Sequence, residues 1–129
     1  MNQARALVID DSKTVRVYHS QILKEAGFYV DEAENGMEGL EKEAAGGYDL
    51  YLVDINMPVL DGYTFVERLR AKEGREKVPV IMISTEAENH DRKNGYAVGA
   101  NLYYVKPVRP DELKRVTRML VCDKIRGGR

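Results

Sequence analysis

Two hydrophobic patterns alternate along this chain of 129 residues, five times over. Short apolar runs typical of buried strands each lead into a longer segment whose apolar residues recur every three or four positions, as in an amphipathic helix. The expected strands cover residues 6–9, 28–33, 50–53, 79–83 and 102–105. The expected helices cover about residues 13–26, 37–45, 63–72, 88–98 and 111–121. This alternation predicts an α/β fold, with a parallel sheet between two layers of helices.

The first two helices illustrate the detail of this prediction. Ser12 stands at the N-cap position of the first helix and Gly27 at its end, where these residue types are favoured. Its apolar stripe consists of Val15, Tyr18, Ile22 and Leu23. His19 falls outside that stripe and is expected on a solvated helix face. The same is expected of Glu38, Glu41, Lys42 and Glu43 on the second helix.

The composition bounds the kind of protein. A chain of this length forms one domain, expected over residues 1–123, with a basic, glycine-rich tail at 124–129 that is disordered or a linker. Twenty Lys and Arg against 21 Asp and Glu give a net charge of −1, which argues against direct nucleic-acid binding. The single Cys122 excludes an internal disulfide. Without a signal peptide or a membrane-length apolar run, the expected compartment is the cytoplasm.

Polar and charged residues stand at the ends of four of the five expected strands. In chain order they are Asp10, Asp11, Asp54, Ser84, Thr85 and Lys106. Because ligands of open parallel sheets bind beyond the carboxyl ends of the strands, these side chains are expected to converge on one edge. The second strand supplies nothing comparable.

The chemistry of this set is consistent with phosphoryl transfer. Three clustered carboxylates repel one another, and a hard divalent cation, Mg²⁺ first, relieves the repulsion. One carboxylate is then free to attack phosphorus as a nucleophile. Lys106 would add positive charge, and the Ser84 hydroxyl and Thr85 N–H would bind phosphoryl oxygens.

Each residue also has a simpler explanation when taken alone. Asp10 or Asp11 could cap the first helix, Ser84 or Thr85 could cap the fourth, and Lys106 could be solvated. Asp54 is harder to explain in this way, since apolar residues flank it on both sides and a buried charge needs support. The joint occurrence of complementary groups at four strand ends favours a functional cleft.

The same residues carry a resemblance to a known family. The chain resembles the receiver domain of two-component response regulators over about residues 5–121. The matching motifs are Val8-Ile9-Asp10-Asp11-Ser12, Val53-Asp54-Ile55-Asn56-Met57-Pro58 with Asp61-Gly62, Val80-Ile81-Met82-Ile83-Ser84-Thr85, and Tyr104-Val105-Lys106-Pro107. The resemblance, and not the pattern itself, implies a doubly wound (βα)5 flavodoxin-like fold with strand order 2-1-3-4-5.

The resemblance also implies roles at the site. Asp54 would be the phosphoacceptor, phosphorylated by a histidine kinase or a phosphotransfer protein. Mg²⁺ would be bound by Asp11, Asp54 and the backbone carbonyl of Asn56, with Asp10 acting through a water. Lys106 would pair with Asp54 and then with the phosphoryl group, and a cis peptide bond would join Lys106 to Pro107.

Further residues would convert phosphorylation into a signal. Ser84 resembles the switch hydroxyl and Tyr103 the switch aromatic, while the Thr85 N–H would face the phosphoryl group. Asn56 and Glu86 would line the path of the water that dephosphorylates the domain. The fourth helix, fifth strand and fifth helix would contact a downstream target, and a phosphorylation-dependent dimer through the last helices is left open. The chain would thus be a regulator that catalyses only its own phosphoryl chemistry.

Four other classes of protein fit the sequence less well. A haloacid-dehalogenase-like phosphatase needs a second Asp where Asn56 stands. A nucleotide-binding protein needs a glycine-rich phosphate motif, which the sequence lacks. A flavin-binding flavodoxin would suffer repulsion between its phosphate and Asp10-Asp11. A scaffold of the same fold without phosphorylation would have no need of the acidic cleft.

Overall fold

The computed structural model describes residues 3–85 and 89–121, with side chains of 89–92 left aside. Its strands are β1 (Arg5–Ile9), β2 (Tyr29–Ala33), β3 (Leu50–Asp54), β4 (Val80–Ser84) and β5 (Leu102–Val105). Its helices are α1 (Lys13–Glu25), α2 (Gly36–Ala45), α3 (Gly62–Arg70), α4 (Asn89–Val98) and α5 (Pro110–Leu120). All strand pairs are parallel and the order is β2-β1-β3-β4-β5. The predicted fold class is confirmed. Glu86, Cys122 and the predicted tail lie outside the described residues.

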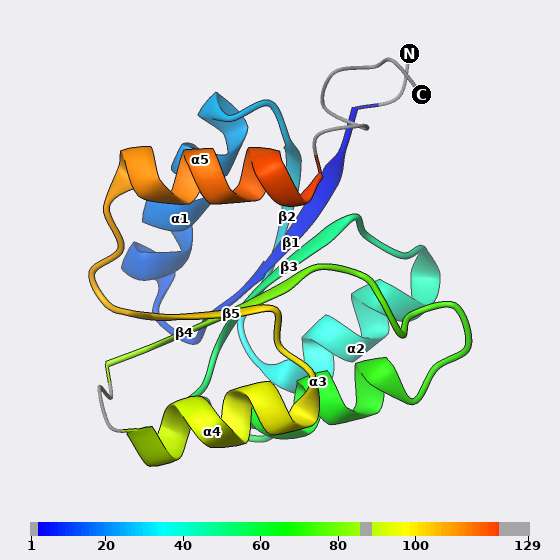
Figure 1. Ribbon diagram of the computed structural model, residues 1–129. Helices are drawn as coiled ribbons and strands as arrows, with labels where there is room; N and C mark the ends of the chain where they lie inside the picture. The colour runs from blue at the N-terminus through cyan, green and yellow to red at the C-terminus, as the bar shows by residue number, and fades with distance from the viewer. Residues whose placement is uncertain (1–2, 86–88, 122–129) are drawn as a thin grey trace.

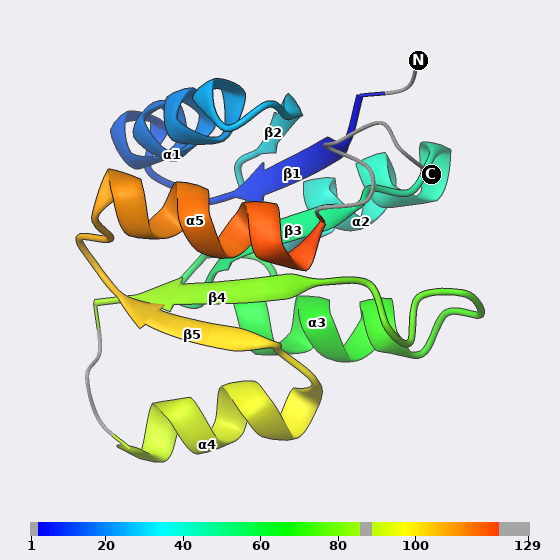
Figure 2. The same ribbon diagram turned by 45° about the horizontal axis from the view of Figure 1, so that its top comes forward.

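The sheet separates two hydrophobic cores. Figure 1 shows α1 and α5 on one face of the sheet and α2, α3 and α4 on the other, and Figure 2 shows the strands side by side. Successive strand residues point to opposite faces: in β1, Ala6 and Val8 join the core under α1 and α5, while Leu7 and Ile9 join the other. No helix among the described residues is long and apolar enough to cross a membrane.

Helix α3 ends at Arg70, two residues before the predicted end, and the Arg70 side chain connects the segments around it. Its guanidinium donates hydrogen bonds to the carbonyls of Arg75, Val78 and Gly99 and to the Asn101 side chain, at 2.7 to 3.1 Å. These bonds hold the turn after α3 and the turn before β5 together.

Two expectations for α1 are wrong. Tyr18 is 42% exposed, whereas His19 is only 3% exposed. Ile22 and Leu23 are buried as predicted, but in the preceding turn His19 and Ser20 are buried in place of Tyr18. Tyr18 lies at the border, where its hydroxyl donates to the Val108 carbonyl at 3.2 Å. The N-cap prediction is confirmed, since the Ser12 side chain accepts a hydrogen bond from the Val15 N–H.

The expectation that Glu43 lies on a solvated face is also wrong. Glu43 is 1% exposed, and its carboxylate pairs with Lys72 and Arg75, which lie beyond the end of α3. A buried carboxylate needs such partners. These partners lie about 30 residues away in the chain, so the sequence of α2 alone could not predict them.

The loop between β3 and α3 contains one strained residue. Val59 has a φ of 71°, and the Leu60 N–H donates to the Pro58 carbonyl at 2.7 Å, which makes a γ-turn. A β-branched residue rarely adopts a positive φ. The turn therefore holds Val59 in an unfavourable backbone conformation.

We expect Val59→Gly to stabilise the protein by about 1 kcal/mol, because glycine adopts a positive φ without steric cost. Val59 is 75% exposed, so little burial is lost. Urea denaturation measures the change. Val17→Gly, at a half-exposed position of α1, is the control and should lower stability by about 1 kcal/mol. Equal effects at both positions would show that Val59 is not strained.

Candidate functional site

Backbone hydrogen bonds continue the sheet by one residue at its carboxyl edge. The Asp10 N–H donates to the Ala33 carbonyl at 3.1 Å, and the Lys106 N–H donates to the Ser84 carbonyl at 2.7 Å. Asp54 itself is the last residue of β3, paired with Ile83 of β4. The positions of the charged side chains are thus fixed by the sheet and not by flexible loops.

Three carboxylates meet at this edge. Carboxylate oxygens of Asp10, Asp11 and Asp54, one from each, all lie within 4.8 Å of one another. Asp10 and Asp54 are 2% and 5% exposed, while Asp11 is exposed. The predicted convergence of these residues is what the geometry shows. Two buried acids therefore adjoin a third acid that is accessible to solvent.

Lys106 bridges the two buried acids. Its Nζ lies 3.1 Å from Asp54 Oδ1 and 3.1 Å from Asp10 Oδ2. The sequence predicted the pairing with Asp54, but the equal contact with Asp10 was not anticipated. The peptide bond between Lys106 and Pro107 is cis.

Burial and repulsion make Asp54 a weaker acid than usual. Desolvation raises the pKa of Asp54 to about 6, the negative charge of Asp10 adds to the rise, and Lys106 offsets part of it. The pKa of Lys106 is raised, because its attraction to Asp54 and Asp10 outweighs the effect of burial. Lys106 is therefore a permanent cation, and Asp54 bears a charge that the folded protein tolerates poorly.

His19 adds no charge to the site at neutral pH. Burial lowers its pKa to about 4, although Asp10 acts in the opposite direction. The only described cation that makes an ion pair with Asp10 or Asp54 is Lys106.

The two residues expected to act as a switch, Ser84 and Tyr103, are both buried. Ser84 ends β4 and is 1% exposed, and Tyr103 of β5 is 3% exposed. Tyr103 belongs to the core under α2, α3 and α4, where its ring lies close to Gly95 of α4. The ring is thus already in the inward position. Thr85 and Asn56 are exposed.

A close backbone approach holds the loop after β3 against the site. The Gly62 N–H donates to the Ile55 carbonyl at 2.9 Å. A Cβ at Gly62 would lie 2.3 Å from the Asp54 carbonyl oxygen and 2.9 Å from Ile55 Cα. Only glycine fits there without a backbone shift.

The donor set fits a hard divalent cation. Oxygen ligands without imidazole or thiolate favour Mg²⁺, which binds through one or two carboxylates and keeps several waters. The clustered oxygens of Asp10, Asp11 and Asp54 meet this requirement, with one of the three accessible to solvent.

Sequence reasoning missed Arg16. From α1, its guanidinium donates to the backbone carbonyl of Asp10 at 2.9 Å and to Glu32 Oε1 of β2 at 3.2 Å. An Arg on an amphipathic helix gives no sign of such contacts in the sequence.

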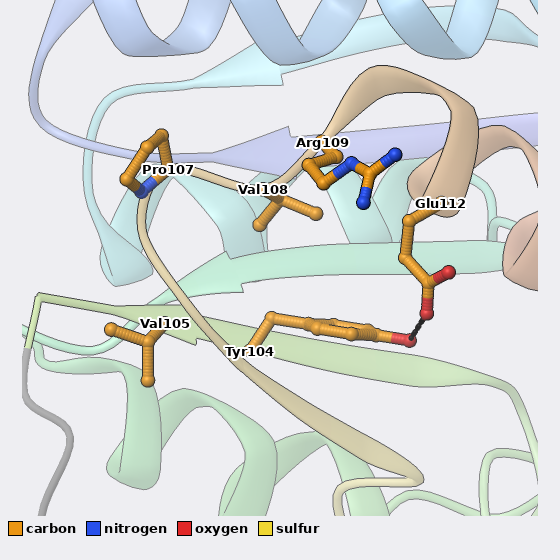
Figure 3. A pocket seen from close by; sticks show the side chains of 6 residues that line it. All are labelled: Tyr104, Val105, Pro107, Val108, Arg109 and Glu112. Atoms are coloured by element: carbon orange, nitrogen blue, oxygen red, sulfur yellow. Dashed lines mark hydrogen bonds between the residues drawn. The ribbon is translucent and has the colours of Figure 1, made fainter.

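A separate pocket of about 230 Å³ lies between β5 and α5. Figure 3 shows the side chains that line it, with the Tyr104 hydroxyl donating to Glu112 at 3.2 Å. The lining residues are Tyr104, Val105, Pro107, Val108, Arg109 and Glu112. The pocket adjoins Lys106 in sequence but contains none of the clustered acids.

Comparison with known proteins agrees with the geometry. The family model described as the response regulator receiver domain matches residues 6–118. The transcriptional regulatory protein ResD of Bacillus subtilis is 35% identical over 112 residues, 87% of this chain and 45% of ResD. The chain spans less than half of the length of the curated relatives that it matches first.

Solved structures are similar over nearly the whole chain. The chemotaxis protein CheY4 of Vibrio cholerae is 34% identical, with a TM-score of 0.87 over 92% of this chain and 99% of that chain. The response regulator TrrA of Thermotoga maritima, solved in complex with Mg²⁺–BeF, is 33% identical, with a TM-score of 0.80 over 91% and 98% of the two chains. This chain therefore belongs to the family of response regulator receiver domains.

Proposed function

We propose that this receiver domain accepts a phosphoryl group on Asp54 from the phosphohistidine of a histidine kinase or phosphotransfer protein. Asp10, Asp11, Asp54 and the Asn56 carbonyl would hold Mg²⁺. The observation that carries the proposal is the contact of Lys106 with both buried acids, within a cluster of three carboxylates. The Mg²⁺–BeF complex of the Thermotoga maritima relative supports it.

Each residue of the site has a distinct role in the phosphoryl transfer. An Asp54 oxygen attacks phosphorus as the bond from phosphorus to the donor imidazole breaks, which leaves an acyl phosphate on Asp54. Lys106, 3.1 Å from that carboxylate, neutralises charge as it builds up on the phosphoryl oxygens. A bound Mg²⁺ would supply further charge neutralisation. Water then attacks the acyl phosphate, which releases inorganic phosphate and returns the free carboxylate, and Asn56 and Glu86 are proposed to tune the rate of this step.

Two buried residues, Ser84 and Tyr103, would transmit the effect of phosphorylation. Phosphorylation adds about −1.5 to −2 charge, and we propose that the Ser84 hydroxyl donates a hydrogen bond to the new group, with the Thr85 N–H as a second donor. Tyr103 would respond in the neighbouring strand. A change from 1% to 99% active needs roughly 5.5 kcal/mol of bias. A few charge-assisted hydrogen bonds of about 1.5–3 kcal/mol each suffice.

The downstream target is proposed to bind the face formed by α4, β5 and α5. Tyr96 of α4 is 47% exposed on this side. The pocket between β5 and α5 offers a hollow for a partner side chain (Figure 3). A phosphorylation-dependent dimer through the same helices is the alternative.

Intact-mass measurement tests the phosphoacceptor. After incubation with Mg²⁺ and acetyl phosphate, the wild-type protein should gain the mass of one phosphoryl group, and Asp54→Asn should gain none. Asp61→Asn is the matched control, because Asp61 is an exposed N-cap of α3 and Asn caps equally well. It should gain mass like the wild type. A gain in Asp54→Asn would place the phosphoacceptor elsewhere.

A further inference from the structure

We infer that Arg16, oriented by Glu32, is a positioning residue that holds the acidic cluster in the geometry that binds Mg²⁺. The inference rests on the proposed function, since it concerns the metal site proposed there. It also assigns a part in the site to β2, the strand whose end supplies none of the site residues predicted from the sequence.

Arg16 acts on the peptide unit that joins the two adjacent acids. Its Nη1 donates to the carbonyl oxygen of Asp10 at 2.9 Å. That carbonyl belongs to the peptide plane between Asp10 and Asp11, so a restraint on it sets the direction in which both side chains leave the backbone. One hydrogen bond therefore restrains two of the three carboxylates.

The other polar groups of Asp10 are restrained too. Its N–H donates to the Ala33 carbonyl at 3.1 Å. One carboxylate oxygen accepts from the Ser12 N–H at 2.9 Å, and the other lies 3.1 Å from Lys106. The bond from Arg16 is the one side-chain restraint on the Asp10 backbone among the described residues. Without it the peptide plane could rotate.

Glu32 fixes the direction of the Arg16 side chain. Arg16 Nε donates to Glu32 Oε1 at 3.2 Å, and the Arg16 side chain is 13% exposed. A guanidinium bonded through two nitrogens cannot turn freely, which a single ammonium could do. The pair thus links the end of β2 to the loop that carries the acids. Such outer partners of metal ligands typically change metal affinity by 10–100-fold when removed.

The electrostatic repulsion between Arg16 and Mg²⁺, taken alone, predicts that removal of Arg16 strengthens binding. Arg16 is a cation close to a cation-binding site, so its removal should strengthen Mg²⁺ binding if charge were its only contribution. The positioning model predicts weaker binding. Arg16→Lys distinguishes the charge model from the positioning model further, because it keeps the positive charge and loses the hydrogen bonds through two nitrogens.

Isothermal titration with Mg²⁺ of the whole chain tests the inference, without any phosphodonor. We expect Arg16→Met and Arg16→Lys each to weaken Mg²⁺ binding about tenfold relative to the wild type. Arg70→Met is the matched control. It removes another Arg bonded to backbone carbonyls, but those carbonyls lie before the amino ends of β4 and β5, at the other edge of the sheet. It should lower the melting temperature and leave Mg²⁺ affinity unchanged.

The outcomes separate this inference from the proposed function. Unchanged affinity in Arg16→Lys, tighter binding in Arg16→Met, or an equal loss in Arg70→Met would each overturn the role of Arg16 and leave the metal site standing. A wild-type protein that binds no Mg²⁺ would overturn the metal site itself. If Arg16→Met does not fold, Arg16→Lys carries the test alone.

Discussion

Asp54→Asn is expected to stabilise the metal-free protein by about 2–3 kcal/mol at pH 8. The pKa of the Asp54 carboxyl is about 6 in the folded protein, against 3.8 for an ordinary Asp. Each unit of difference corresponds to roughly 1.4 kcal/mol. The ionised carboxylate is therefore less stable in the folded site than in the unfolded chain, and a neutral amide of the same shape removes that penalty.

The effect should depend on pH in a defined direction. Between about pH 4 and pH 6 the folded protein holds a proton on Asp54 that the unfolded chain has lost, so this group makes the wild type more stable as the pH falls through that window. The penalty is complete above about pH 6 and absent below about pH 4. The difference in the free energy of unfolding between Asp54→Asn and the wild type should therefore shrink as the pH falls from about 6 to about 4.

Urea denaturation at pH 8 and at pH 4 measures this difference. Asp61→Asn provides the control, and its stability should match the wild type at both values. Added Mg²⁺ should stabilise the wild type at pH 8, because a ligand that binds only the folded state favours folding. Lower stability of Asp54→Asn at pH 8 would contradict the view that the site is strained by its own charge.

Gly62→Ala should destabilise the protein by about 2–3 kcal/mol, within the range for inserting atoms into a closely packed position. The added Cβ would lie 2.3 Å from the Asp54 carbonyl oxygen. Both groups near it are backbone, so no side-chain rotation can relieve the clash. The β3–α3 loop must move away from Asp54, and Mg²⁺ affinity should fall as well.

Gly46→Ala is the matched control for that measurement. Gly46 has a φ of 165°, which any residue adopts, and a Cβ there would meet only an Arg5 nitrogen at 3.6 Å. Its stability should stay within about 0.5 kcal/mol of the wild type. If Gly62→Ala behaves like this control, the close approach of the loop to β3 is not a constraint.

The layout of the site was predictable because a parallel sheet brings its strand ends together. Asp10, Asp54 and Lys106 follow runs with clear strand patterns, so their positions at one edge follow from the topology. The orientation of Tyr103 toward the core with α2, α3 and α4 also follows from the alternation along β5, because its neighbours Leu102 and Tyr104 pack against the other core.

The side chains that support the site were not predictable in this way. Arg16, His19 and Glu43 lie on helices, where a shift of one residue turns a side chain by about 100°. Their burial depends on partners elsewhere in the chain, such as Glu32 for Arg16 and Lys72 for Glu43. Local periodicity contains no information about those partners.

The edge strand β5 carries two neighbouring rings that face different ways. Tyr103 packs in the core with α4, and Tyr104 packs toward α5, where its hydroxyl reaches Glu112. Because β5 has only β4 beside it, any displacement of this strand must disturb both helical layers together. A fluorine label on each ring would therefore report on the two layers separately in one NMR spectrum. The order in which the two signals shift would show which helical layer changes first.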